Sequence, residues 1–167
     1  MKILGIDPGY GRIGIAIIDG KDLVHSECFS TSPKDDFHIR LKEIGQRVNA
    51  LIKEYRPEVM AIESLFITKN QKTAMKVAEA RGVISYEASL VDIPIHEYSP
   101  PQIKVAVTGH GGSDKAQITK MIPLLIKMLA KDSKKKILDD EYDAIAVALT
   151  CQAHTGNKGC LSCPQAK

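Results

Sequence analysis

The chain opens with apolar residues that alternate in the pattern of strands. Residues 1–20 read MKILGIDPGYGRIGIAIIDG, in which two apolar segments flank a turn rich in Pro and Gly. Alternation with a period of two is typical of strands, and Pro and Gly favour the turn between them. A second turn at Asp19-Gly20 and a third expected strand over residues 23–29 follow. The pattern predicts a three-stranded meander.

Helical and strand patterns alternate along the rest of the chain. Apolar residues recur at helical spacing over residues 41–55 and stop at Arg56-Pro57. Strands are expected at 59–62 and 93–98, and helices at 70–86, from residue 99, at 113–125 with Ser113 as N-cap, and from 139 or 140 to 149. Pro123 should kink or split its helix. This order predicts an α/β fold, with a mixed five-stranded sheet and helices on both faces.

Two of the expected strands end in a carboxylate. Asp7 closes the first strand, and Glu63 directly follows the strand at 59–62. An unpaired carboxylate is costly to bury, so each acid is either solvated or neutralised by a positive charge. A turn ahead of Pro8 is an alternative explanation for Asp7. If the strands are neighbours, both carboxylates leave the sheet at one edge, where open sheets bind ligands.

Two more acids lie at the start of the last expected helix. Asp140 and Asp143 are three residues apart and share a helix face. Interaction with the helix dipole is a simpler explanation for them. Four acids that converge without a basic residue among them would repel one another, and this favours bound divalent cations. Because all the ligands would be oxygens, magnesium or manganese is favoured over zinc. Two such ions would activate water at a phosphodiester and stabilise the leaving oxygen.

Composition is that of one globular domain. The chain has 167 residues, of which 44% are hydrophobic and 26% are charged, and we expect a domain at 1–150 with a short flexible tail at 151–167. No apolar run is long enough to span a membrane, and residues 1–20 lack a signal-peptide pattern, so a cytoplasmic location is expected. The formal charge of +3 does not by itself indicate a nucleic-acid partner. Lysines at 104, 115, 120, 131 and 134–136 could form a basic surface or a solvated loop.

The four cysteines are expected to be reduced thiols in that compartment. Cys28 stands alone, whereas Cys151, His154 and Cys160-x-x-Cys163 have the residue types of a zinc site. Their spacing is tight, and a flexible tail is the favoured interpretation.

Seven short motifs follow one another in order along the chain. They are GIDPG at 5–9, AIE at 61–63, FxxKN at 66–70, ARG at 80–82, the segment 98–104, DKAQ at 114–117 and DxxDA at 140–144. The ordered set resembles the RuvC-type Holliday junction resolvases of the ribonuclease H-like superfamily, and the resemblance spans residues 2–150. It implies a homodimeric endonuclease that binds four-way DNA junctions and nicks two strands of like polarity, leaving 5'-phosphate and 3'-hydroxyl ends.

The resemblance also implies roles for particular residues. The metal-binding catalytic acids would be Asp7, Glu63, Asp140 and Asp143, with two Mg²⁺ ions per site that Mn²⁺ could replace. The neighbours of Asp140 in the DDEYD cluster, Asp139 and Glu141, leave open which acids face the ions.

Basic and aromatic residues complete the set that the resemblance implies. Lys104 and Lys115 would lie near the scissile backbone, and Phe66 would stack on an unpaired base, with Lys69 and Asn70 also binding DNA. Packing under a loop is the alternative for Phe66. The helix at 70–86, with its small residues, would form the subunit interface, and a RuvAB-type branch-migration complex is a possible partner.

Three rival interpretations remain open from the sequence. The segment RIGIA at 12–16 also occurs in YqgF-like nucleases, which share the fold and act on RNA or nicked DNA. GIDPG also resembles a phosphate loop of actin-like nucleotide-binding proteins. A catalytically silent DNA-binding module is the third alternative, which an intact set of four acids disfavours.

Overall fold

One mixed sheet forms the centre of the molecule. The structure, a computed structural model, describes residues 1–65, 71–128 and 137–156. Within these residues the strands are β1 (Lys2–Asp7), β2 (Arg12–Asp19), β3 (Asp22–Ser30), β4 (Val59–Glu63), β5 (Ile95–Tyr98) and β6 (Lys127–Met128). They lie in the order β5-β4-β1-β2-β3-β6. The expected five strands are present, and the two-residue β6 adds a short parallel pair with β3.

The sheet combines an antiparallel meander with parallel strands. β1 pairs antiparallel with β2, and β2 pairs antiparallel with β3, as the alternating pattern predicts. β4 and β5 continue the sheet on the other side of β1, and both pairings are parallel. The carboxyl ends of β1 and β4 therefore meet at one edge of the sheet.

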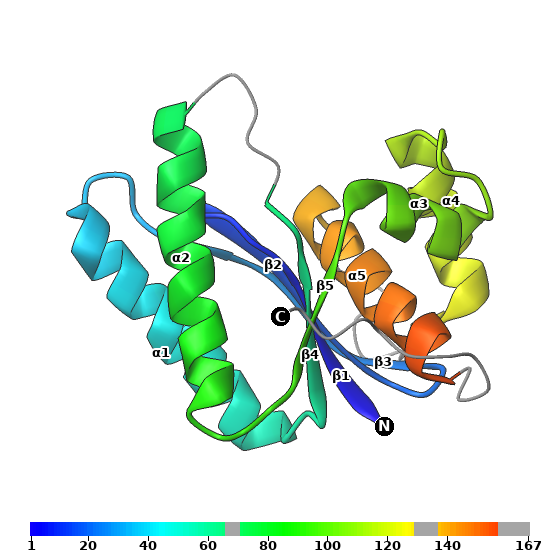
Figure 1. Cartoon of the computed structure of the whole chain (residues 1–167), viewed down its shortest axis with the longest axis horizontal. Coiled ribbons are helices and arrows are strands. Elements are labelled where there is room, and N and C mark those ends of the chain that lie inside the picture. The colour runs from blue at the N-terminus through cyan, green and yellow to red at the C-terminus, as the bar shows by residue number, and fades with distance from the viewer. Residues whose placement is uncertain (66–70, 129–136, 157–167) are drawn as a thin grey trace, which may run out of the picture.

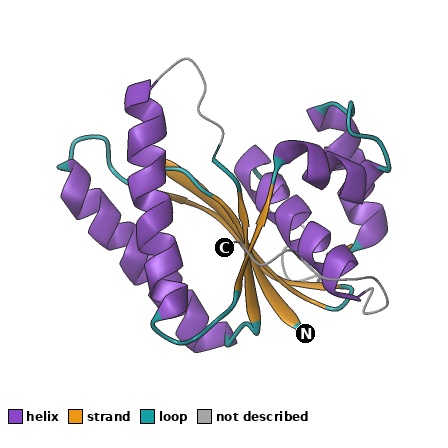
Figure 2. Ribbon diagram, in the orientation of Figure 1, coloured by secondary structure: helices purple, strands orange, loops and turns teal. Residues whose placement is uncertain are grey.

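Helices cover both faces of the sheet (Figures 1 and 2). On one face lie α1 (Phe37–Tyr55) and α2 (Gln71–Ser89), which pack on β-strand residues such as Leu4 and Ile6. On the other face lie α3 (Pro100–Thr108), α4 (Lys115–Leu125) and α5 (Asp139–Gly156). There α5 packs on residues such as Ile3 and Ala16. None of the described helices combines the length and apolar character needed to cross a membrane.

Two glycines let α5 approach β1 and β2 closely. A Cβ placed on Gly5 would lie 2.7 Å from the Cβ of Ala148. A Cβ placed on Gly14 would overlap the backbone carbonyl of Asp140. Because neither site has room for a side chain, the start of α5 rests directly on the first hairpin.

The N-cap of α4 differs from the sequence expectation by one residue. Asp114, not Ser113, caps the helix: its Oδ1 accepts a hydrogen bond from the Gln117 backbone N–H at 2.8 Å, and the Gln117 side chain accepts from the Asp114 N–H at 2.9 Å. The Ser113 hydroxyl is buried instead, 2.7 Å from the Thr108 hydroxyl. This reciprocal capping box explains the first and last residues of the DKAQ motif.

Two other helix boundaries also differ from the expectation. Pro123 does not split α4, which continues to Leu125. The proline cannot donate the usual hydrogen bond to the carbonyl four residues earlier, but it lies in the last turn, so the helix ends only two residues later. The last helix continues past residue 150 to Gly156 because Cys151 is fully buried against the core and extends its apolar face. Residues 151–156 are thus helical rather than part of a flexible tail.

Candidate active site

The centre of the candidate site is the carboxylate of Asp7 at the end of β1. Asp7 pairs with Gly14 of β2, and Gly14 pairs with Cys28 of β3. Paired residues on neighbouring strands point to the same face of a sheet. Asp7 and Cys28 therefore lie in one row on the face covered by α5, and Gly14 between them leaves the space that α5 enters.

Glu63 extends this row on the other side of Asp7. The last residue pair between β1 and β4 joins Ile6 to Ile62, and the next residues on the two parallel strands are Asp7 and Glu63. Both acids end their strands, and both are half-buried at the same edge of the sheet. The sheet thus brings together two carboxylates that are far apart in the sequence.

The start of α5 brings two more acids to this edge. Asp140 and Asp143 lie in its first turns and are half-buried. Asp140 forms an ion pair with Arg12 of β2. Asp143 forms an ion pair with Lys115 of α4, with 2.8 Å between Nζ and Oδ2. Each of these two carboxylates therefore already has a basic partner.

The pKa values of Asp7 and Glu63 are affected by the other acids of the site. The pKa of Asp7 is raised from 3.8 to about 7, chiefly by burial and then by the negative charges of Glu63, Asp143 and Asp140, while Lys115 opposes the rise. Burial also raises the pKa of Glu63, as does the charge of Asp143, again against Lys115. A site that disfavours the ionised form of its own carboxylates is one in which an added positive charge is favourable.

Two basic residues face the acids across a small cavity. The cavity has a volume of about 240 Å³ and is lined by Glu63, Asp143, Lys104 of α3 and Lys115 of α4, with apolar residues around them. The Lys115 ammonium also lies 3.8 Å from Asp139. The structure therefore brings both lysines named from the sequence to the acidic edge.

The acids that neighbour Asp140 face elsewhere. Glu141 is 1% exposed, and its carboxylate accepts hydrogen bonds from the Ser26 hydroxyl at 2.8 Å and from the Leu138 backbone N–H at 3.2 Å. It attaches the start of α5 to β3. The Asp139 side chain is 76% exposed. Of the acids at 139–143, Asp140 and Asp143 are the two whose charges raise the pKa of Asp7.

Arg12 and Cys28 belong to this site although the sequence analysis did not propose them. The Cys28 thiol donates to Asp140 at 3.5 Å, beside the Arg12 guanidinium. Strand parity could have placed each residue on one face of its own strand, but not beside Asp140. Arg12 precedes Gly14 by two, and Cys28 pairs with Gly14, so both share the face of Asp7.

Several expected residues lie outside the described part of the chain. They are Phe66, Lys69 and Asn70, which were expected to bind DNA, and Cys160 and Cys163 of the possible zinc site.

The carboxylates suit a hard divalent cation in their chemistry, but they do not yet form a closed cage. Among residues 1–65, 71–128 and 137–156, no three His, Cys, Asp or Glu side chains are close enough together to hold an ion as they stand. The ion pairs with Arg12 and Lys115 explain this, because they draw Asp140 and Asp143 toward basic partners. The four acids offer only oxygen ligands, they are partly buried, and their negative charges are not fully neutralised. They therefore fit Mg²⁺ or Mn²⁺ once the ion pairs with Arg12 and Lys115 open.

Comparisons with known protein sequences all give the same family. The family model "Crossover junction endodeoxyribonuclease RuvC" matches residues 3–151. A protein of that name from Thermosipho melanesiensis is 43% identical over 152 residues, which is 89% of this chain and 94% of the relative. One from Brevibacillus brevis is 42% identical over 154 residues, 90% of each chain.

Solved structures give the same result. The chain matches Thermus thermophilus RuvC, solved in complex with a Holliday junction substrate, with a TM-score of 0.85 and 29% identity over 93% of this chain and 94% of that one. The yeast mitochondrial Holliday junction resolvase matches with a TM-score of 0.69 at 13% identity over 92% of this chain and 78% of that one, which shows a shared fold. The mixed sheet with helices on both faces is thus the ribonuclease H-like fold expected from the sequence.

Proposed function

This chain belongs to the RuvC family of crossover junction endodeoxyribonucleases, and we propose that it resolves Holliday junctions in DNA recombination and repair. It binds a four-way DNA junction and nicks two strands of like polarity symmetrically, leaving 5'-phosphate and 3'-hydroxyl ends. One observation carries the proposal: Asp7 and Glu63 leave adjacent parallel strands at the edge where α5 brings Asp143, beside Lys115.

The nuclease is metal-dependent, and we propose that the metal is Mg²⁺, with two ions per site and Mn²⁺ able to substitute. Asp7, Glu63, Asp140 and Asp143 would hold the ions. When bound, such ions supply a water nucleophile at neutral pH and stabilise charge on the leaving oxygen. The raised pKa of Asp7 supports this assignment, because divalent cations would restore its ionised form.

The residues of the cavity wall act on the DNA backbone. Lys104 and Lys115 lie on two helices that face the acids, within reach of a phosphate seated at the cavity mouth. An ammonium group there binds a phosphate oxygen and stabilises negative charge that develops on it. Phe66, Lys69 and Asn70 are proposed to contact DNA from the adjoining segment, with Phe66 stacking on a base at the crossover.

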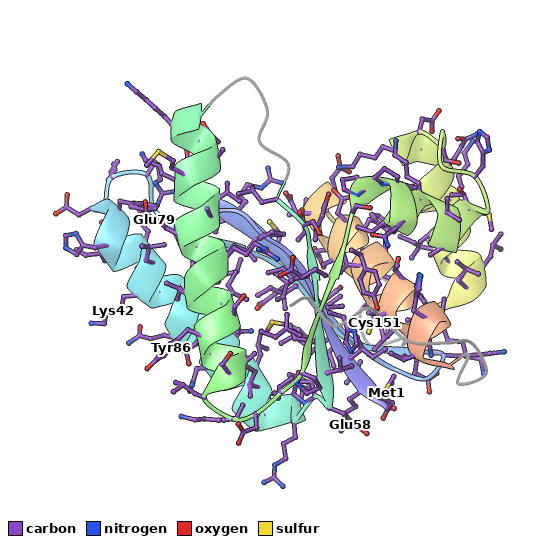
Figure 3. The ribbon with its side chains drawn as sticks, in the orientation of Figure 1. Met1, Lys42, Glu58, Glu79, Tyr86 and Cys151 are labelled. Carbon is purple, nitrogen blue, oxygen red and sulfur yellow. The ribbon has the colours of Figure 1, made fainter. Side chains whose placement is uncertain are left out.

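We further propose a twofold homodimer that uses the outer surface of α2. Met75 and Tyr86 on this helix are 66% and 61% exposed, and Gly82 between them has open space above it. Figure 3 shows Tyr86 and Glu79 on α2, on the side of the molecule away from α5. A twofold dimer would place two active sites on the two like strands of a junction. A branch-migration complex of the RuvAB type and a cytoplasmic location are also proposed.

The proposal is tested by offering a labelled four-way junction, a linear duplex and an RNA–DNA hybrid with magnesium or EDTA. We expect paired symmetric nicks in the junction alone and only with metal. Asp7→Asn should abolish them. Asp19→Asn is the matched control, because Asp19 lies at the opposite end of the same strand pair, against Lys2. It should cut like the unchanged protein.

Other outcomes would favour the rival interpretations. Equal cutting of all three substrates, or preference for the hybrid, would favour a nuclease of the YqgF-like kind. ATP turnover without nicking would favour an actin-like protein. Junction binding without cleavage under any metal would leave only a DNA-binding module.

A further inference from the structure

Arg12 has no role in the function proposed above, yet its side chain lies in the active site. It begins β2, two residues before Gly14, and so points to the face of the sheet that carries Asp7. Its guanidinium forms an ion pair with Asp140 at the start of α5. The Arg12 side chain is 56% exposed and that of Asp140 is 24% exposed, so the pair lies at the rim of the site.

Asp140 is held from a second strand as well. The Cys28 thiol of β3 donates to the Oδ2 of Asp140 at 3.5 Å, and the same oxygen contacts Arg12. Gly14 lets the backbone of Asp140 approach between them. One carboxylate oxygen therefore already has two protein donors from β2 and β3, and it must exchange them before it can coordinate a cation.

The charges at the site show how the contact between Arg12 and Asp140 would affect metal binding. Arg12 and a divalent cation both neutralise Asp140, and one carboxylate oxygen cannot make its best contact with both. Lys115 stands in the same relation to Asp143, but it also lines the cavity beside Lys104, where a phosphate would bind. Arg12 is absent from that cavity lining. The described contacts of Arg12 therefore indicate that it acts through Asp140.

We propose that Arg12 is a positioning residue that holds Asp140 in the metal-free enzyme and competes with the incoming cation for it. The inference rests on the proposed function, because it takes Asp140 as a metal ligand. Arg12 then lowers the metal affinity of the free enzyme and keeps the acidic edge of α5 ordered until metal arrives. It also gives a physical role to the arginine of the RIGIA segment.

The size of the effect follows from the exposure of the pair. Exposed arginine–carboxylate pairs contribute modestly, so removal of Arg12 should tighten metal binding by about two- to fivefold. Added salt screens an exposed pair, so the difference between the variant and the unchanged protein should shrink as ionic strength rises.

The test measures metal binding without DNA and without turnover. Free Mn²⁺ is followed by electron paramagnetic resonance during titration of the full chain and of Arg12→Gln and Arg12→Lys. We expect Arg12→Gln to bind Mn²⁺ about two- to fivefold more tightly, and Arg12→Lys to lie between it and the unchanged protein. Arg47→Gln is the matched control: Arg47 pairs with Glu27 at 2.6 Å on the α1 side of the sheet, and its loss should leave Mn²⁺ affinity unchanged.

The possible failures can be told apart. If Arg12→Gln binds Mn²⁺ equally or more weakly while the unchanged protein binds it normally, the inference is overturned and the proposed function stands. A lower melting temperature of Arg12→Gln without tighter Mn²⁺ binding also overturns it, because Arg12 would then only brace α5. If neither protein binds Mn²⁺, the metal site itself is wrong and both proposals fall.

Discussion

Lys115 Nζ lies 2.8 Å from the Oδ2 of Asp143, and through this ion pair α4 delivers a positive charge to the acidic edge of the sheet. The same charge lowers the pKa of both Asp7 and Glu63, against burial and the neighbouring acids. Lys115→Met should therefore raise both pKa values, so that the acids keep their protons to higher pH. We expect slower cleavage and an acidic limb of the pH–rate profile that moves upward.

Lys120→Met is the control for this experiment. Lys120 is an exposed residue further along the same helix. Its variant should keep the pH profile of the unchanged protein. A profile of Lys115→Met that keeps its position, or moves toward lower pH, would show that Lys115 does not set the charge of these carboxylates.

Ionised Asp7 should destabilise the metal-free protein. Its pKa is raised from 3.8 to about 7, so the folded state holds a proton that the unfolded state has lost between those values. The stability that this group contributes is complete below pH 3.8 and disappears as the pH rises through about 7. Asp7→Asn removes the effect, and in EDTA above that pH the variant should be more stable by at most about 4 kcal/mol.

Denaturant unfolding at several pH values measures this difference. The difference in stability between Asp7→Asn and the unchanged protein should vanish at low pH. Magnesium should reduce the difference at neutral pH, because the unchanged protein binds the metal more strongly than the variant. A variant that is less stable than the unchanged protein at high pH in EDTA would mean that Asp7 is ionised and well paired without metal.

Gly14 is expected to be essential for the position of α5. A Cβ there would overlap the backbone of Asp140, so Gly14→Ala must push the helix away from β2. We expect a loss of stability of about 1–3 kcal/mol and a loss of cleavage, because Asp140 and Asp143 move with the helix. Gly156→Ala, at the other end of α5, meets nothing within 4 Å and should change neither property. Normal cleavage by Gly14→Ala would contradict the close approach.

The proposed dimer can be tested at its most exposed aromatic residue. Tyr86 is 61% exposed on α2, so Tyr86→Glu should leave the protomer folded but disrupt a twofold interface. Analytical ultracentrifugation should then detect monomers and circular dichroism an unchanged fold. Leu124→Glu on α4, where the residue is 77% exposed, is the control and should remain dimeric. A dimeric Tyr86→Glu would place the interface elsewhere.

Much of the site could be predicted because it depends on strand ends. Apolar runs that stop at Asp7 and Glu63 indicate where two strands terminate, and parallel neighbours terminate at one edge. The ion pair of Arg12 with Asp140 could not be predicted in this way. It depends on the register of β1, β2 and β3 and on the position of α5 over Gly14, and single-sequence periodicity reports neither.

Local chemistry explains the smaller differences. Ser113 and Asp114 are both good N-cap residues, and only the position of Gln117, three residues after Asp114, distinguishes them. The burial of Cys151 depends on the core that α5 shares with the sheet, so the sequence pattern alone predicts an end of the last helix that is too early. Glu141 was a candidate ligand in the sequence, whereas its hydrogen bond from Ser26 turns it toward β3.

Anomalous diffraction from a crystal soaked in Mn²⁺ tests the central claim most directly. The account predicts manganese peaks within coordination distance of Asp7 and Glu63, with Asp140 turned from Arg12 toward the metal and Asp143 turned from Lys115. Peaks absent from the end of β1, or manganese bound only elsewhere on the molecule, would contradict it.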